Sequence, residues 1–281
     1  GLIEGKSFIR SVNKYNYPRL AGEIPDFNIK SFVKDSKYSR LSNVTQYSLA
    51  STILAVSDAA IGFKKISSDK IGIILGTASG PGLTTERICD SLIEVGKASV
   101  KPILFPESVF NAPVSLISIF YGIKGPCIAL PMGHASGVYS INAAMNYFNS
   151  YDLDCILVIA SDEICKSVHE AYDYLKVLSP NDNQGEGIKP FDRKANGTVL
   201  SEGSVAIILE TETSALKREA KVYAEIAGCA MSSDAYKIAD NNPDGSGLCR
   251  AIKNAMQQAE ISAENIDYIA ASASGIKNQD M

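Results

Sequence analysis

The sequence has no block of lysine and arginine residues and no hydrophobic run long enough to span a bilayer. Its 27 Lys and Arg residues are outweighed by 31 Asp and Glu residues, which gives a net charge of −4. The longest hydrophobic runs, such as residues 155–160 and 205–209, have the length of buried strands. We therefore expect neither nucleic acid nor a membrane as a partner.

The sequence also lacks a C-x-x-C pair, although it contains six cysteines. Several of them lie inside hydrophobic runs, which is typical of small core residues in a reducing compartment. We expect no metal, no cofactor and a cytoplasmic location, with a disulfide or a zinc site as the less favoured alternative. The chain opens on Gly rather than Met and stops just after an expected strand has entered a loop, so we expect both ends to be truncated. No targeting segment is visible, although a missing N-terminus could have carried one.

What is present is an ordinary globular composition, 46% hydrophobic and 21% charged over 281 residues. Hydrophobic strands alternate with amphipathic helices, which predicts an α/β layered fold with a parallel or mixed sheet. The expected strands are 70–75, 126–130, 154–160, 198–210 with a break at 202–203, 221–231 and 267–272. The expected helices are 43–62 (capped by Asn43 or Thr45), 84–96, 107–121, 135–149, 163–178, 213–219 and 246–260.

The strongest functional signal is the stretch Gly-Pro-Cys-Ile-Ala-Leu-Pro-Met-Gly-His-Ala-Ser-Gly at 125–137. It predicts a short strand, a tight turn with His134 at its apex, and a helix of small residues. A side chain at such an apex lies beside unpaired backbone N–H groups, which could stabilise an oxyanion. Strand–turn–helix elbows commonly carry a nucleophile, and histidine is an unusual residue for that position.

Three weaker signals favour ordinary structural roles. His169, the only other histidine, has no partner cluster near it in sequence and is expected on the surface. The glycine-rich turn at 76–82 fits neither a dinucleotide-binding nor a P-loop spacing, so close packing is favoured over nucleotide binding. A scatter of basic residues forms either a solvated surface or a site for an acidic partner, and comprises Lys30, Lys34, Lys37 and Arg40.

Several blocks of the sequence, in order, resemble the β-ketoacyl-acyl carrier protein synthases, which are thiolase-fold condensing enzymes. The strongest are Tyr-Gly-Ile-Lys-Gly-Pro-Cys-Ile-Ala (121–129), Lys-Pro-Phe-Asp-Arg (189–193) and Val-Leu-Ser-Glu-Gly (199–203). Ser136-Gly137 belongs with the first block. Further blocks lie at 221–228, 231–236 and 267–269. The similarity covers essentially the whole chain.

This resemblance implies a thiolase-like layered α-β-α-β-α fold, usually as a dimer, with acyl carrier protein as a partner. Residues 1–218 would form the N-terminal half without its first strand. Residues 219–281 would begin the C-terminal half, so a change of unit is expected near 214–220.

The chain departs from the family at two positions that the resemblance marks as catalytic. The family places a cysteine, which carries the acyl chain as a thioester, where this sequence has His134. The family places a histidine that promotes decarboxylation where this sequence has Ser272, within Ala-Ala-Ser-Ala-Ser-Gly (270–275). The second family histidine and the lysine would lie beyond residue 281. Cys127 is expected to be a core residue rather than a relocated nucleophile.

These departures favour a β-ketoacyl synthase-like subunit of type II fatty-acid or polyketide biosynthesis that does not elongate. Like a chain-length factor, it would heterodimerise with an active ketosynthase and help to shape the acyl tunnel. The helix at 107–121 and the elbow helix would lie at or near that interface, and His134 would be a buried histidine without chemistry. One alternative is an active acyltransferase or decarboxylase that uses His134 on acyl carrier protein thioesters. Another is an acyl-binding or scaffold protein that dimerises only with itself.

Overall fold

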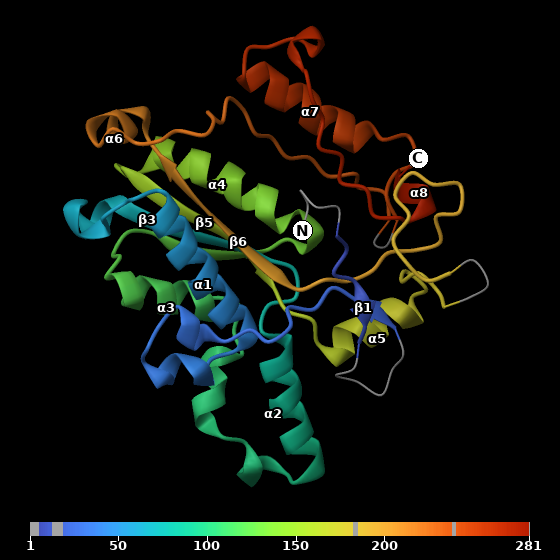
Figure 1. Cartoon of the computed structure of the whole chain (residues 1–281). Coiled ribbons are helices and arrows are strands. Elements are labelled where there is room, and N and C mark those ends of the chain that lie inside the picture. Colours follow the sequence, from blue (N-terminus) through green and yellow to red (C-terminus); the bar gives the residue numbers. More distant parts are fainter. Residues whose placement is uncertain (1–5, 13–18, 182–184, 238–239, 281) are drawn as a thin grey trace. The chain divides into compact units, whose positions relative to one another are not determined.

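The computed structural model describes residues 6–12, 19–181, 185–237 and 240–280 of the chain (Figure 1). They form two compact units, which we treat separately. The sheet unit comprises Ile24–Val168 and Glu202–Tyr223. The second unit comprises Gly1–Glu23, His169–Ser201 and Ala224–Met281.

The sheet unit is built on a four-stranded mixed sheet with the order β4-β3-β5-β6. Strand β3 (Ile71–Thr77) pairs in parallel with β4 (Cys127–Pro131) and with β5 (Cys155–Asp162). Strand β6 (Gly203–Glu210) runs antiparallel to β5. Every residue of β3 is buried, as the unbroken hydrophobic run at 70–75 predicts for a strand covered on both faces.

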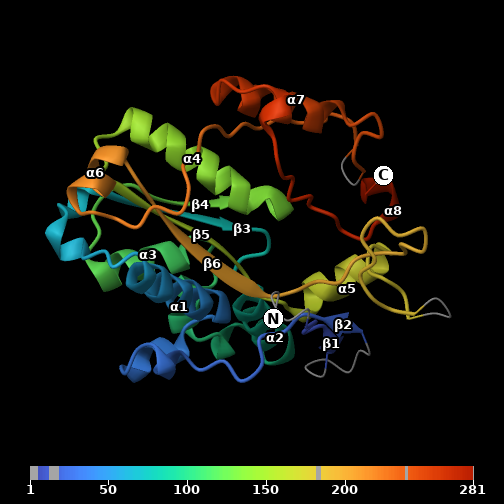
Figure 2. The same ribbon diagram turned by 45° about the horizontal axis from the view of Figure 1, so that its top comes forward.

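Helices cover both faces of this sheet (Figures 1 and 2). Helices α1 (Asn43–Asp58) and α3 (Ala112–Tyr121) pack on one face, around the buried side chains of Leu49, Ile73 and Ile117. Helix α4 (Ser136–Ser150) packs on the other face, where Ala144 and Ile156 are buried. The mixed α/β layering predicted from the sequence is therefore confirmed.

Two helix starts differ from the sequence prediction. The N-cap of α1 is Ser42, whose hydroxyl accepts the amide of Thr45, rather than Asn43 or Thr45. Helix α3 begins five residues later than expected, because Pro102–Glu107 forms the separate 3₁₀ helix η7. Helices α2 (Gly82–Glu94) and α6 (Glu212–Lys217) complete the unit close to their predicted positions.

The second unit contains the short antiparallel pair β1 (Arg10–Ser11) and β2 (Leu20–Ala21), and helices α7 (Ser246–Gln258) and α8 (Lys277–Asp280). Helix α5 (Lys166–Tyr174) is shorter than the predicted 163–178, and Lys176 just beyond it has a left-handed backbone with φ of 57°. Residues 198–202 do not extend β6. Leu200 and Ser201 lie instead beside Gly22, whose amide donates to the Leu200 carbonyl at 2.9 Å.

The predicted strands at 221–231 and 267–272 are wrong, since neither segment pairs with a strand in the described part of the chain. Both segments are extended and have the hydrophobic residues of strands, but a strand also needs a neighbour to complete its hydrogen bonds. The amide of Cys229, for example, donates to the side chain of Gln258 at 3.0 Å. Tyr268 and Ile269 are exposed.

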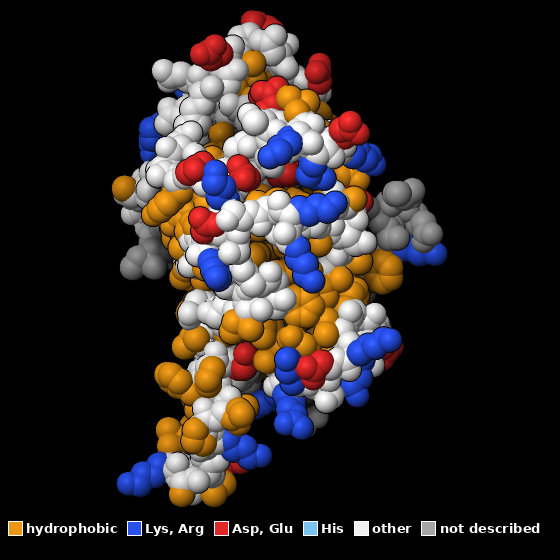
Figure 3. All heavy atoms as spheres, turned by 90° about the vertical axis from the view of Figure 1, so that its left-hand side faces the viewer, with side chains coloured by type: hydrophobic (Ala, Val, Ile, Leu, Met, Phe, Trp, Pro, Cys, Tyr) orange, Lys and Arg blue, Asp and Glu red, His pale blue; other side chains and the backbone are white. Residues whose placement is uncertain are grey.

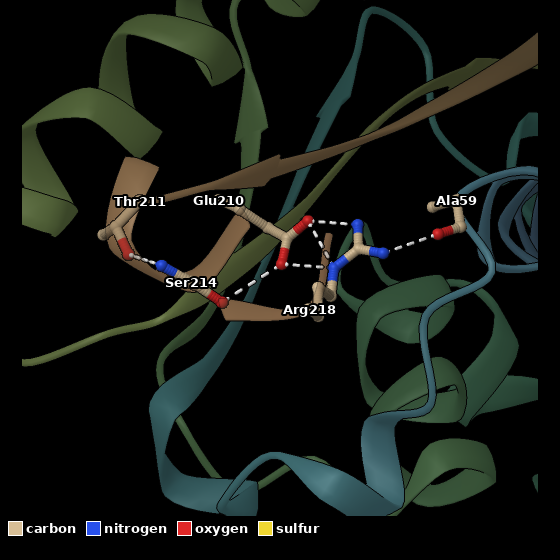
Figure 4. Close-up of polar contacts among 5 residues, drawn as sticks. All are labelled: Ala59, Glu210, Thr211, Ser214 and Arg218. Carbon is tan, nitrogen blue, oxygen red and sulfur yellow. Dashed lines mark hydrogen bonds and ion pairs between the residues drawn. The ribbon is translucent and has the colours of Figure 1, made fainter. Parts of the chain in front are cut away.

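An ion pair joins the ends of three elements of the sheet unit (Figure 4). The guanidinium of Arg218, just after α6, donates to both carboxylate oxygens of Glu210 at the end of β6. It also donates to the carbonyl of Ala59, the C-cap of α1, at 2.8 Å. Glu210 also accepts a hydrogen bond from a second residue, the hydroxyl of Ser214, at 3.1 Å. Its side chain is only 8% exposed, so its charge depends on these donors.

We expect Arg218→Met to lower the free energy of unfolding by about 3 kcal/mol, because it leaves the Glu210 carboxylate buried without its cation. The size is at the lower end for a buried pair, since a quarter of the Arg218 side chain is exposed. Urea unfolding followed by circular dichroism measures it. The matched control is Lys217→Met on the exposed neighbouring residue, which should change the stability by less than about 0.5 kcal/mol. Equal effects of the two substitutions would contradict this role.

Candidate functional site

The elbow predicted at 125–137 is present in the structure. Strand β4 ends at Pro131, the 3₁₀ turn η8 (Gly133–Ala135) follows Met132, and α4 begins at Ser136. Gly133 has φ of 61°, a left-handed conformation that glycine adopts without strain. His134 lies inside this turn, directly before the N-terminus of a 15-residue helix.

The His134 side chain is exposed, so the expectation of a buried histidine is wrong. The turn that carries it stands at the end of the edge strand β4, where Pro131 and Met132 are exposed as well. An exposed imidazole at a helix N-terminus can donate or accept hydrogen bonds and can act as a nucleophile or base. Whether it does so here stays a prediction.

Ser136 stabilises the elbow through hydrogen bonds of its buried hydroxyl. Its buried hydroxyl accepts the amide of Met132 at 2.9 Å and lies within donating distance of two carbonyls, those of Thr77 at 2.7 Å and Gly133 at 2.6 Å. The turn is thereby tied to the end of β3. The sequence suggested the elbow but not this role of the serine.

Gly76 in β3 makes room for the first turn of α4. A Cβ atom at this position would lie 2.4 Å from the carbonyl oxygen of Ser136, which is far inside van der Waals contact and would be a steric clash. The same carbonyl accepts the hydroxyl of Ser140 at 2.8 Å. The preference for close packing over nucleotide binding at the glycine-rich turn agrees with this contact.

Ser272, the other predicted position, lies in the second unit. It is exposed and belongs to a segment without helix or strand. His134, by contrast, belongs to the sheet unit. The roles assigned to both positions stay predictions.

Two expectations about buried residues need correction. Cys127 is exposed on β4 rather than part of the core, because β4 is an edge strand of the sheet. Partial burial nevertheless raises the pKa of its thiol, which disfavours the thiolate that a nucleophile needs. His169 is 1% exposed rather than a surface residue, and burial lowers the pKa of its imidazole. The groups that act on its ring include Leu20 of β2 and Glu186, which lie far away in sequence, so local sequence reasoning does not reveal them.

A buried carboxylate that the sequence analysis overlooked lies just beyond β5. Glu163 accepts the amide of Val44 at 2.9 Å and that of Leu83 at 2.8 Å, one on each oxygen. These amides belong to the first turns of α1 and α2, so one side chain caps two helices. The only signal in the sequence is the acidic pair that follows a hydrophobic strand at 155–161.

Among the residues that the structure describes, no group of three or more His, Cys, Asp or Glu side chains could hold a metal ion. No helix within the described ranges is long and apolar enough to cross a membrane.

Residues 1–215 match the family described as "Beta-ketoacyl synthase, N-terminal domain", and residues 223–281 match its C-terminal domain. The chain belongs to the β-ketoacyl synthase family. It is 28% identical over 275 residues to 3-oxoacyl-[acyl-carrier-protein] synthase 2 of Coxiella burnetii, and 30% identical to that of Synechocystis sp.. These alignments cover 95% and 96% of the chain but only 66% of each relative.

Solved ketosynthase-family structures share its fold. The ishigamide ketosynthase/chain length factor superposes with a TM-score of 0.89 at 24% identity, covering 98% of this chain and 68% of that one. A β-ketoacyl synthase from Burkholderia phymatum gives a TM-score of 0.86 at 24% identity, with 99% and 69% coverage. A type II polyketide ketosynthase solved in complex with its acyl-carrier protein gives 0.86 at 24% identity, with 98% and 68% coverage. The expected thiolase-like fold is therefore confirmed.

We expect Glu163 to make stability depend on pH. Burial raises the pKa of its carboxyl, and Glu202 raises it further, whereas the two amides and Arg87 lower it. A raised pKa means that the folded state binds the proton more tightly. The resulting stability is present below the unfolded pKa of about 4.3 and is lost as the pH rises through the folded value.

The test compares wild type with Glu163→Gln by urea unfolding between about pH 4 and about pH 7. Loss of the hydrogen bonds to Val44 and Leu83 shifts the stability of the variant by a constant amount. On top of that shift, the free energy of unfolding of wild type minus that of the variant should fall as the pH rises. Glu94→Gln, at the exposed end of α2, is the matched control and should leave this difference flat. A difference that grows with pH would contradict the assignment.

Proposed function

We propose that this chain belongs to a ketosynthase-like subunit of type II fatty-acid or polyketide biosynthesis that does not itself elongate the acyl chain. It would heterodimerise with an active ketosynthase and help to shape the acyl tunnel. The observation that carries the proposal is the imidazole of His134 at an otherwise complete elbow. Because the chain spans 66% of its curated relatives, the activity and partners of the whole protein are part of the proposal.

An imidazole is poorly suited to hold a growing chain. It can attack a thioester, but the acyl-imidazole is more labile than a thioester, so it stores an acyl group badly. Ser272 would offer a neutral hydroxyl where the family resemblance places a histidine, and losing one such group typically costs a hundredfold or more in rate. The two substitutions do not compensate each other, since one removes the covalent carrier and the other a decarboxylation group.

The second candidate is an enzyme that uses His134 directly, as an acyltransferase or a decarboxylase. The exposure of the His134 side chain favours it over the reading of a buried, inert histidine, because substrates can reach the ring. A scaffold that pairs only with itself is the third candidate.

The free edge of β4 is the surface best suited to the partner subunit. Among the strands that the structure describes, β3 is the one that pairs with β4, so the opposite edge of β4 is available for another strand to add. Helix α3 packs over β3 and β4, and its Ile119 is 78% exposed. Hydrophobic side chains also gather on α2 and η7 of the same unit, among them Ile93 and Phe105 (Figure 3). Exposed apolar surface of this kind is typical of protein interfaces.

Acyl carrier protein is the proposed second partner. The four basic residues singled out in the sequence are all exposed on η2 (Ile29–Ser31), η3 (Ser36–Arg40) and the segment between them. Lys37 forms an ion pair with Asp35 at 3.1 Å and lies over the ring of Tyr38. We propose that the acidic partner expected at this surface is the acyl carrier protein. The positive charges of the four basic residues would attract it electrostatically.

We expect the full-length protein to gain no acyl mass when it is incubated with acyl carrier thioesters and measured by intact mass spectrometry. His134→Cys should gain one acyl group, because a thiol at a helix N-terminus has a lowered pKa and forms a stable thioester. The double variant His134→Cys, Cys127→Ser is the control that excludes the neighbouring cysteine. A stable acyl group on His134, or carbon dioxide released from malonyl carrier without a partner subunit, would establish the enzymatic alternative instead.

We expect Ile119→Glu to weaken the association with an active ketosynthase about tenfold or more, because it buries a carboxylate in the interface beside β4. The matched control is Leu54→Glu, which changes an exposed leucine of α1 on the same face of the sheet, over β5 and β6. Co-expression followed by sedimentation velocity measures both. Pairing of the wild type with itself alone would support the scaffold, and equal weakening by both variants would remove the β4 edge from the proposal.

A further inference from the structure

Asp162, the last residue of β5, accepts hydrogen bonds from the end of β3 and from the loop that follows it. Its carboxylate accepts the amide of Ala78, which lies 2.9 Å from each oxygen, and the amide of Ser79 at 2.9 Å. It also accepts the hydroxyl of Thr77 at 2.8 Å and that of Ser79 at 3.1 Å. Hydrogen bonds to an ionised acceptor are about twice as strong as neutral ones, so this carboxylate holds three consecutive residues.

Thr77 connects this loop to the elbow. Its hydroxyl donates to Asp162 and accepts the amide of Gly80 at 3.0 Å, which fixes its rotamer. Its backbone is in register with Pro131, the last residue of β4, and its carbonyl is the 2.7 Å acceptor of the Ser136 hydroxyl.

The same Ser136 hydroxyl accepts the amide of Met132 at 2.9 Å. A continuous series of contacts therefore runs from Asp162 through Thr77 and Ser136 to the backbone two residues before His134. All of these residues belong to the sheet unit.

We propose that Asp162 is a positioning residue for the elbow. By fixing the end of β3, it fixes the acceptor that orients Ser136, and Ser136 in turn holds the turn that presents residue 134. The inference deepens the proposed function, because it names what holds the apex in place. The role of Asp162 requires neither a partner subunit nor a thioester. It can therefore fail while the proposed function stands, and the proposed function can fail while this role stands.

Amide hydrogen exchange followed by NMR tests the series of contacts. In Asp162→Asn the side-chain nitrogen replaces the oxygen Oδ2, where it faces the amide of Ala78 as donor against donor. The remaining oxygen is neutral, so it accepts weaker hydrogen bonds from Ala78 and Ser79. We expect exchange at these two amides to quicken about tenfold or more. The decisive expectation is that exchange at the Met132 amide, which never touches Asp162, quickens to a similar degree, whereas the β5–β6 ladder stays protected.

Two variants define the order of the links. Ser136→Ala should quicken exchange at Met132 and leave Ala78 and Ser79 protected, since it cuts the series beyond Thr77. Asp152→Asn changes an exposed carboxylate that pairs with Lys70 before the start of β5, and should change none of the three amides. If Asp162→Asn does not fold, Thr77→Val removes one donor to the carboxylate and should also quicken Met132.

Residues 1–281 contain two histidines, His134 and His169, and their assigned imidazole NMR signals give a second readout. In Asp162→Asn we expect the His134 signals to shift and those of the buried His169 to stay unchanged. Faster exchange at Ala78 and Ser79 with an unchanged Met132 amide and unchanged His134 signals would reduce Asp162 to a local cap and overturn the proposal. The same result from Thr77→Val would overturn it equally.

Discussion

The close approach of the first turn of α4 to strand β3 is the constraint on which the elbow depends. It is possible only because Gly76 has no Cβ atom, which would otherwise meet the carbonyl of Ser136. The approach then brings the Ser136 hydroxyl to the carbonyl of Thr77 and to the amide of Met132. Ser136 and Thr77 are both buried, so the contact between them is satisfied within the protein and cannot be exchanged for water without cost.

The sequence predicted those parts of the fold whose signal is local. Strands β3 and β5 follow from hydrophobic runs without alternation, and the elbow follows from a strand, a glycine and a helix of small residues. The segments at 221–231 and 267–272 have the composition of strands but no strand beside them in the described part of the chain. Whether a strand finds a neighbour depends on the tertiary structure, and residue propensities alone do not predict it.

The candidate site was predicted in location but not in construction. His134 stands at the apex as expected, because the turn is encoded by neighbouring residues. Glu163 and Asp162 act on amides 80 or more residues away along the chain, so their roles exist only once the sheet has brought those amides near. The environment of Cys127 was misjudged for a similar reason, since its sequence shows a strand but not that the strand lies at an edge.

The frame of the elbow and the residue at its apex are physically separable. The frame consists of buried groups at positions 76, 77 and 136, whereas the side chain of His134 is exposed. A change at position 134 can therefore alter the chemistry without altering the fold, and family membership alone does not determine what the turn does. A complete frame around a residue that holds acyl groups poorly favours a role in which the shape of the turn matters more than a thiol. The assisting subunit that we propose has that requirement, because it must keep the contour of the tunnel while its partner carries the chain.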